Sequence, residues 1–355
     1  MEFLYLLEKI RNPVFDFFFS LITHLGEETV FLAVAILFFW CINKREGYFI
    51  LITGLVGTLV NQMLKLVCKI PRPWVKKPEF TVVESAKAEA TGYSFPSGHT
   101  QNIAGTFGAI GVYHRKKWIR ISAIVIIVLV AFSRMYLGVH TPWDVLTSLG
   151  IAAVLVFGLY PLFKNEKIYK KAMPIIVAVT FILAFLFVLY VIYMPNRPSY
   201  SDANYKSAVK NAYTLFGSAL GLVVVYSVDT MYINFDTKAR WYAQILKYAL
   251  GLGIIIGIKA GLSTPLTLLF GNEYVARAMR YFIIVFFAGV LWPLTFKLFA
   301  KIRIGYFDDL GVRVACIFNK ELRAENALQY EAEKRIKLRE KKLKMQRKKA
   351  KNKKK

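Results

Sequence analysis

Residues 173–194 read MPIIVAVTFILAFLFVLYVIYM, without a single charged side chain. A second uncharged run covers residues 145–163, and shorter ones cover 103–113 and 121–132. A helix needs roughly 20 apolar residues to cross the hydrocarbon of a bilayer, so each of the two longer runs is long enough to span it. Hydrophobic residues make up 56% of the 355-residue chain, more than a soluble protein of this size carries. The sequence therefore predicts a membrane protein with several spans.

The apolar runs and the residues that interrupt them predict about ten helices, in an all-α transmembrane bundle of two blocks. The first block, residues 1–171, is a six-helix core with helices near 12–25, 28–42, 47–67, 98–114, 118–135 and 142–163. The second block, residues 172–304, adds four helices near 172–194, 207–228, 243–269 and 276–302. Residues 305–355 follow as a tail. The first two helices are short, which is typical of a tilted or interfacial segment.

Basic residues between the helices set the expected orientation. They cluster at residues 44–45, 115–120 and 164–171, which all fall on one side of the core. The positive-inside rule makes that side cytoplasmic. We therefore expect a multi-pass protein of the cytoplasmic membrane with both termini in the cytoplasm. Residues 68–95 and 137–141 then face outside, although the basic residues within 68–95 oppose this orientation unless some of them bind an anion.

The net charge of +26 is concentrated in the tail, where residues 334–355 hold 14 Lys and Arg against the single acid Glu340. Such a block beside membrane spans favours contact with anionic lipids. Nucleic acid is not an expected partner, because no recognition fold precedes the tail. The three cysteines, Cys41, Cys68 and Cys316, are spaced too irregularly for a disulfide framework or a metal site.

The first polar motif is Lys65-Leu-Val-Cys-Lys-Ile-Pro-Arg72-Pro73. Lys65 and Arg72 lie two helical turns apart, which puts them on one face if the helix continues. Proline ends the helix here and leaves Arg72 at the water boundary. Two cations directed to one place suit a dianionic phosphate, which arginine binds through two N–H groups. Two interfacial cations that snorkel to water are the alternative.

The second motif is Phe95-Pro96-Ser97-Gly98-His99. Ser97 is a typical N-cap, and Gly98 lets the backbone approach a ligand closely. The N–H groups that open the following helix form an anion site, and His99 lies inside it as a proton donor. A capped helix start with an incidental histidine is the alternative.

The third motif is Ser133-Arg134-Met-Tyr-Leu-Gly-Val-His140-Thr-Pro-Trp-Asp144. Thr141 can cap the next helix, and Asp144 three residues later completes the pattern of a capping box. Alternatively, Asp144 accepts a hydrogen bond from one ring nitrogen of His140, which leaves the other nitrogen free to attack phosphorus. Both interpretations need the same carboxylate.

Together, Lys-x6-Arg-Pro, Pro-Ser-Gly-His and Ser-Arg-x5-His-x3-Asp resemble the signature of the type 2 phosphatidic acid phosphatase superfamily at every position. The resemblance covers about residues 65–144, and the six surrounding helices look like the membrane core of that family. Soluble vanadium haloperoxidases share the motif set, but the hydropathy of this chain excludes a soluble enzyme.

The resemblance implies that His140 is the nucleophile, Asp144 its orienting partner and His99 the general acid. It implies that the phosphoryl oxygens are held by Lys65, Arg72, Ser97, Gly98 and Arg134. It also implies catalysis without a metal or another cofactor.

The expected function is hydrolysis of a lipid phosphate or pyrophosphate on the outer face of the membrane, through a phosphohistidine. Polyprenyl pyrophosphate is the first choice of substrate, because the site is expected to open outward. Phosphatidylglycerol phosphate, phosphatidic acid and sphingoid phosphates remain open. The alternatives are a lipid phosphotransferase, which would use the same residues, and a non-enzymatic lipid transporter or scaffold.

Overall fold

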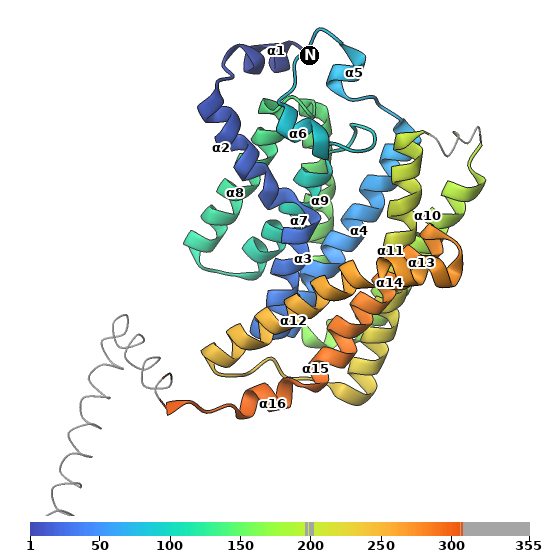
Figure 1. Cartoon of the computed structure of the whole chain (residues 1–355). Helices are drawn as coiled ribbons and strands as arrows, with labels where there is room; N and C mark the ends of the chain where they lie inside the picture. The colour runs from blue at the N-terminus through green and yellow to red at the C-terminus, as the bar shows by residue number, and fades with distance from the viewer. Residues whose placement is uncertain (196–197, 199–201, 306, 308–355) are drawn as a thin grey trace, which may run out of the picture.

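The computed structural model describes residues 1–195, 198, 202–305 and 307. Every regular element in this part of the chain is a helix, which confirms the all-α prediction (Figure 1). Seven of the described helices are long and apolar enough to cross a membrane. These spans are built on α4 (Lys44–Cys68), α8 (Lys117–Tyr136), α9 (Pro142–Lys164), α10 (Glu166–Tyr193), α11 (Ala203–Val228), α12 (Trp241–Gly261) and α14 (Glu273–Phe286).

The helix α7 (Gly98–Tyr113) lies at the centre of the first block, where it packs against α4, α8 and α9. It has 16 residues and is therefore about 24 Å long, short of the roughly 30 Å of a hydrocarbon core. Glycine and alanine recur along it, and Ala104, Gly105 and Ala109 let the neighbouring helices approach closely. The residues that open α7 lie inside the bundle as a result.

In the second block, α11 and α14 pack against each other through small residues. A Cβ on Gly217 would lie 2.0 Å from the carbonyl oxygen of Ala278, so only glycine permits this approach. One ion pair joins the two blocks: Lys44 Nζ, at the start of α4, lies 3.0 Å from Asp229 Oδ2, directly after the end of α11. The expected boundary at residue 171 falls within α10, which begins at Glu166.

The described chain has fewer spanning helices than the ten expected. The helices α2 (Pro13–Thr23) and α3 (Glu28–Leu37) are joined by η1 (His24–Gly26) with a bend of 52°, and are apolar and long enough for a span only as a pair. The pair runs from the end of the bundle that carries α1 toward the opposite end, as a broken span does (Figure 1). The expected helix 243–269 breaks at Leu262, where α12 gives way to the short α13 (Ser263–Phe270). The remaining short elements are η2 (Phe38–Ile42), α5 (Pro73–Lys76), α6 (Glu84–Glu89), η3 (Asp229–Ile233), η4 (Phe287–Leu291), α15 (Trp292–Leu294) and α16 (Phe296–Lys301).

The N-terminal helix α1 (Glu2–Lys9) packs on the segment that follows α5. The Tyr5 ring meets Phe80 edge to face at 5.5 Å, and Arg11 Nη1 donates to the carbonyl of Thr81 at 2.8 Å. The N-terminus therefore lies at the same end of the bundle as residues 68–95, and α16 lies at the opposite end (Figure 1). The sequence predicted the N-terminus and residues 68–95 on opposite faces. The structure places them at the same end, because α2 and α3 together cross the bundle only once.

Candidate active site

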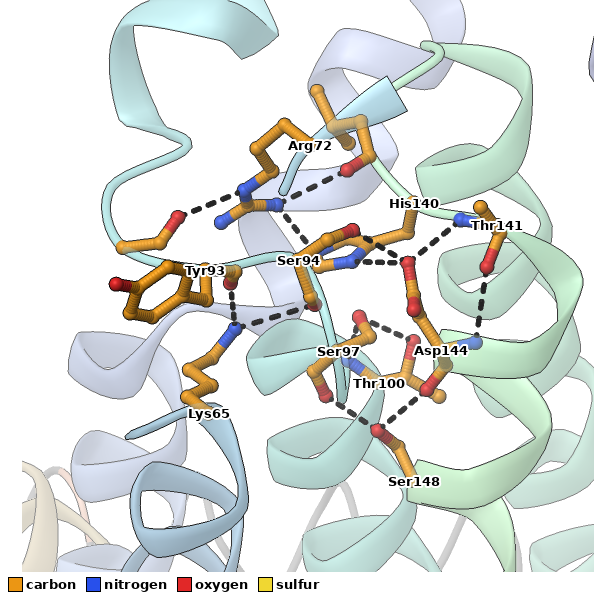
Figure 2. A network of polar contacts seen from close by, with 12 residues as sticks. Lys65, Arg72, Tyr93, Ser94, Ser97, Thr100, His140, Thr141, Asp144 and Ser148 are labelled. Atoms are coloured by element: carbon orange, nitrogen blue, oxygen red, sulfur yellow. Dashed lines mark hydrogen bonds and ion pairs between the residues drawn. The ribbon is translucent and has the colours of Figure 1, made fainter. Parts of the chain in front are cut away.

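The three sequence motifs meet at the end of the bundle that carries α5 and α6. Lys65 comes from the last turns of α4, Arg72 from the turn after it, and His140 from the connection between α8 and α9. Figure 2 shows these side chains converging on Ser94 and Asp144. Segments that are far apart in the sequence thus form one polar cluster within a membrane bundle.

Arg72 reaches across this cluster with three of its nitrogens. Its Nη1 lies 2.9 Å from His140 Nε2 and donates to the carbonyl of Val139 at 3.0 Å. Its Nε and Nη2 donate to the carbonyls of Gly92 and Thr91 at 3.1 and 2.8 Å. Carbonyl oxygens occupy donors that in a complex would suit phosphate oxygens. Arg72 is therefore already held in the place where an anion would be bound.

Lys65 holds the same loop from the other side. Its Nζ donates to the carbonyls of Tyr93 and Ser94 at 2.5 and 3.3 Å. Lys65 and Arg72 are both buried, as predicted for cations that face a common site rather than snorkel to water. The snorkelling alternative for this pair does not fit the structure.

His140 and Asp144 are in contact at the start of α9. The distance between His140 Nδ1 and Asp144 Oδ2 is 3.3 Å, and both side chains are buried. A carboxylate on Nδ1 favours the tautomer that carries its proton there, which leaves the lone pair on Nε2. That nitrogen is the one that faces Arg72.

The Asp144 carboxylate makes the contacts of both interpretations that the sequence left in competition. Its Oδ2 accepts from the Thr141 N–H at 2.8 Å, and Thr141 Oγ1 accepts from the Asp144 N–H at 3.3 Å, which is a complete capping box. The same Oδ2 accepts from Ser94 Oγ at 2.6 Å and contacts His140. The cap therefore fixes the carboxylate in a position where it contacts the imidazole.

Ser97 caps α7, as predicted. Its Oγ accepts from the Thr100 hydroxyl at 2.9 Å and from the Thr100 N–H at 3.4 Å. Ser148 Oγ donates to the Ser97 carbonyl at 2.8 Å and so ties the start of α7 to α9. Gly98 and His99 follow at the first positions of the helix, where N–H groups have no partner within the helix and attract anions.

Arg134 positions the third motif from the end of α8. Its carbonyl accepts from the N–H groups of Val139 and His140, both at 3.2 Å, and Gly138 turns the chain with φ +81°. Its guanidinium is buried, and Nη1 donates to Thr23 Oγ1 at 2.6 Å. Arg134 thus places both the turn that carries His140 and a third cation.

A cavity of about 300 Å³ opens between these groups. Its wall includes six of the predicted site residues: Lys65, Arg72, Gly98, His99, Arg134 and His140. Ser97 and Asp144 lie behind the wall and support it through the cap of α7 and the contact with His140. The eight predicted residues therefore lie in one place, six at the surface of the cavity and two behind it.

Burial lowers the pKa of the His140 imidazole well below its ordinary value, and the nearby Arg72, Arg134 and Lys65 cations lower it further. A lowered pKa means that the ring stays neutral to a lower pH than a free histidine does. The ring is then uncharged in the neutral range, and its Nε2 lone pair faces the Arg72 Nη1 donor.

Sequence reasoning missed several polar residues of the site. Ser94, Ser148 and Thr23 each hydrogen-bond to a predicted site residue, and Asn61 and Gln101 line the cavity. Asn61 lies one helical turn before Lys65, and Gln101 one turn after Gly98. Their spacing from the motifs was the only available signal.

Two family models match this chain. The PAP2 superfamily matches residues 45–168, and the transmembrane extension of PAP2 superfamily phosphatases matches residues 213–303. Phosphatidylglycerophosphatase B of Bacillus subtilis (strain 168) is 30% identical over 163 residues, which cover 42% of this chain and 75% of that protein. The chain belongs to the PAP2 superfamily.

Other relatives of this PAP2 protein carry related names. Undecaprenyl-diphosphatase BcrC of Bacillus subtilis (strain 168) is 31% identical over 151 residues, which cover 41% of this chain and 74% of that protein. Lipid phosphate phosphatase delta of Arabidopsis thaliana is 24% identical over 287 residues, 70% of this chain and 68% of that protein. No solved structure shows significant similarity to this chain.

The two roles of Asp144 in this PAP2 site are separable by substitution. Thr141→Ala removes the Oγ1 half of the capping box but keeps the Thr141 N–H bond to Asp144 Oδ2 and the contact with His140, so we expect a loss of about 1 kcal/mol of stability with turnover largely kept. Asp144→Asn removes the negative charge in contact with His140 Nδ1, so if that charge orients the imidazole we expect turnover to fall roughly 10⁴-fold. Thermal unfolding and phosphate release, measured on both variants, check this. Equal losses of turnover would contradict separate roles for the cap and for the contact with His140.

Proposed function

We propose that this PAP2 protein is a membrane lipid phosphatase that transfers the phosphoryl group of its substrate to His140 and then to water. The relatives named above are phosphatases of lipid phosphates or diphosphates, which supports the reaction class. The observation that carries the mechanism is the arrangement around His140. Nδ1 contacts the Asp144 carboxylate at 3.3 Å, and Nε2 lies 2.9 Å from Arg72 Nη1 at the wall of a cationic cavity.

The first step is attack on phosphorus. The phosphate oxygens take over hydrogen bonds from Arg72, which releases the Nε2 lone pair of His140. That lone pair forms the P–N bond as the bond between phosphorus and the ester oxygen breaks. His99, which lines the same cavity, gives its proton to the departing alkoxide, so a lipid alcohol leaves.

The second step is hydrolysis of the phosphohistidine. His99, now without its proton, accepts one from water as the water oxygen attacks phosphorus and the P–N bond breaks. Inorganic phosphate leaves, and His140 returns to its neutral form. In both steps Lys65, Arg72 and Arg134 offset the charge on the phosphoryl oxygens, together with the N–H groups that open α7. We propose that this neutralisation is sufficient without a metal ion.

Release of inorganic phosphate by the purified protein tests this proposal. We expect release from at least one of a panel of lipid phosphates and pyrophosphates, unchanged in excess chelator. Vanadate should inhibit, because it adopts the trigonal-bipyramidal geometry for which such a site is shaped. A strict requirement for magnesium would contradict the cationic cradle. Transfer of the labelled phosphate to another acceptor, with none freed, would identify a phosphotransferase instead.

We propose that the site opens on the outer face of the cytoplasmic membrane. The basic clusters at residues 44–45, 115–120 and 164–171 lie at the end of the bundle opposite α5 and α6, and the positive-inside rule assigns that end to the cytoplasm. The N-terminus lies at the end that carries the site, so we place it outside. The chain leaves the described bundle at the basic end, near Trp241, whose Nε1 donates to the Phe307 carbonyl.

Single cysteines at exposed lysines test this orientation. In a chain with its own three cysteines replaced by serine, we expect an impermeant maleimide to label Lys87→Cys in intact cells. The matched variant Lys116→Cys should react only after the membrane is opened. Both side chains are exposed, so accessibility depends on the face alone. The reverse pattern would overturn the orientation.

The basic tail and Cys316 lie outside the described residues. Contact between this tail and anionic lipids of the inner leaflet stays a prediction from charge, at roughly 1 kcal/mol per basic residue near the surface.

A further inference from the structure

The cavity continues past the phosphate-binding cations into a wall of carboxamides. Five Asn and Gln side chains line it: Asn61, Gln62, Gln101, Asn102 and Asn211. Three of them already have hydrogen bonds within the protein. Asn211 Nδ2 donates to Gln62 Oε1 at 3.0 Å, and Asn102 Nδ2 donates to the carbonyl of Gly26 at 3.3 Å.

Asn61 and Gln101 are different. Each side chain is only 1% exposed, and neither the oxygen nor the nitrogen of either amide has a hydrogen-bond partner among the described residues. An unsatisfied buried polar group destabilises the fold, so native proteins keep few of them. Two amides without any hydrogen-bond partner in one cavity wall indicate that these groups bind a ligand.

Both amides lie beside the phosphate-binding end of the cavity. Gly57, Asn61 and Lys65 follow one another at four-residue spacing along one buried face of α4. Gln101 is one turn into α7 from Gly98, and its Nε2 packs where a Cβ on Gly57 would lie, at 2.6 Å. Asn61 Oδ1 lies 4.0 Å from the position of a Cβ on Gly98. The two amides therefore lie at the α4–α7 contact, one turn deeper than the cations.

We propose that Asn61 and Gln101 bind the polar part of the lipid next to its phosphoester, and that the substrate is a lipid monophosphate with a hydroxyl or amino group there. This rests on the proposed function. An amide offers both donors and an acceptor. A second phosphate offers only acceptors and would leave Asn61 Oδ1 and Gln101 Oε1 unpaired, whereas a hydroxyl or ammonium group donates to them.

The charge of the remaining wall agrees with this choice. Glu27 and Glu28, at the start of α3, line the same cavity. Carboxylates disfavour a second anionic group and favour a hydrogen-bond donor. The substrate class inferred here thus differs from polyprenyl pyrophosphate, the first choice from the sequence, which has no hydroxyl or amine beside its diphosphate.

Three lipids of equal chain length test the inference: an acylglycerol phosphate with a free hydroxyl, a sphingoid-base phosphate with an amine, and a plain alkyl phosphate. We expect kcat/KM to be roughly 10- to 100-fold higher for at least one of the first two than for the third, as when a site hydrogen-bonds a substrate group. Asn61→Ala and Gln101→Ala should each reduce this ratio about tenfold, mainly by losing activity on the favoured lipid. Which of the two lipids is preferred identifies the donor.

Asn211→Ala is the matched control, because it removes an amide of the same cavity wall that is already bonded to Gln62. It should change kcat/KM for all three lipids in equal proportion. If an alanine variant does not fold, Asn61→Leu and Gln101→Met fill the same space without polar atoms. A ratio near one in the wild type, or a ratio that the Asn61 and Gln101 variants leave unchanged, would overturn the inference.

Binding separates this inference from the proposed function. The His140→Ala protein, which we expect to bind lipid without turnover, should show the same preference in Kd, and Gln101→Ala in that background should reduce it about tenfold. Selective binding by a wild-type protein that frees no phosphate would refute the function and support the subsite. Phosphate release from all three lipids without any preference in binding would support the function and refute the subsite.

Discussion

Replacing His140 with alanine is expected to lower kcat/KM for the lipid substrate by roughly 10⁴-fold or more, because the proposed covalent nucleophile is lost with the imidazole. Loss of the imidazole also frees Arg72 Nη1 from its contact with Nε2, so binding of the lipid phosphate should be kept or slightly tightened. Phosphate release and equilibrium binding, measured on the same preparation, check both expectations.

His114→Ala is the matched control for this experiment. His114 lies at the opposite end of α7, where its Nε2 is 2.9 Å from the buried Glu46 carboxylate. This substitution should cost stability but leave phosphate release by the folded protein unchanged. Ordinary turnover by His140→Ala would show that the nucleophile is wrongly assigned.

Replacing His99 with alanine should lower turnover of the lipid by roughly 10²- to 10⁴-fold, the range for loss of a general acid. The loss of turnover should depend on the leaving group, which distinguishes the His99 substitution from the His140 substitution. A lipid alkoxide needs a proton as it leaves, whereas nitrophenolate needs little protonation. We therefore expect His99→Ala to keep much more of its activity on nitrophenyl phosphate than on the lipid.

The check is the ratio of kcat values for the two substrates in the wild type and in His99→Ala. An equal loss on both substrates would contradict a role in leaving-group protonation. It would indicate that His99 serves only to bind the phosphate or to shape the start of α7.

The parts of this site that depend on local chain geometry were predictable from the sequence. The N-caps by Ser97 and Thr141 follow from residue type and position, and the His140–Asp144 contact follows from a spacing of four residues. Pairing within one helix turn leaves a pattern in the sequence. The competition between a capping Asp144 and one in contact with His140 was not resolvable in this way, because one oxygen makes both contacts.

Contacts between distant segments left no such pattern. Ser94 and Asp144 are 50 residues apart, and nothing in either neighbourhood predicts their hydrogen bond. The open amides of Asn61 and Gln101 likewise depend on how α4 and α7 meet. In the fold, residues 24–28 mark the break between α2 and α3, but nothing in the sequence shows that the two helices, bent by 52°, count together as one span. This pairing merges two expected spans into one and moves the N-terminus to the other end of the bundle.

The central claim is that phosphate passes through a covalent bond to His140, and rapid quenching with labelled lipid tests it most directly. Under alkaline quench, where phosphohistidine survives, we expect a phosphoenzyme that forms and decays at rates consistent with turnover. Peptide mapping should place the label on His140, and His140→Ala should not form it. Turnover with the label on another residue would contradict the account. So would single-turnover phosphate release with no phosphoenzyme at any time, under conditions in which an accumulated phosphoenzyme would be detected.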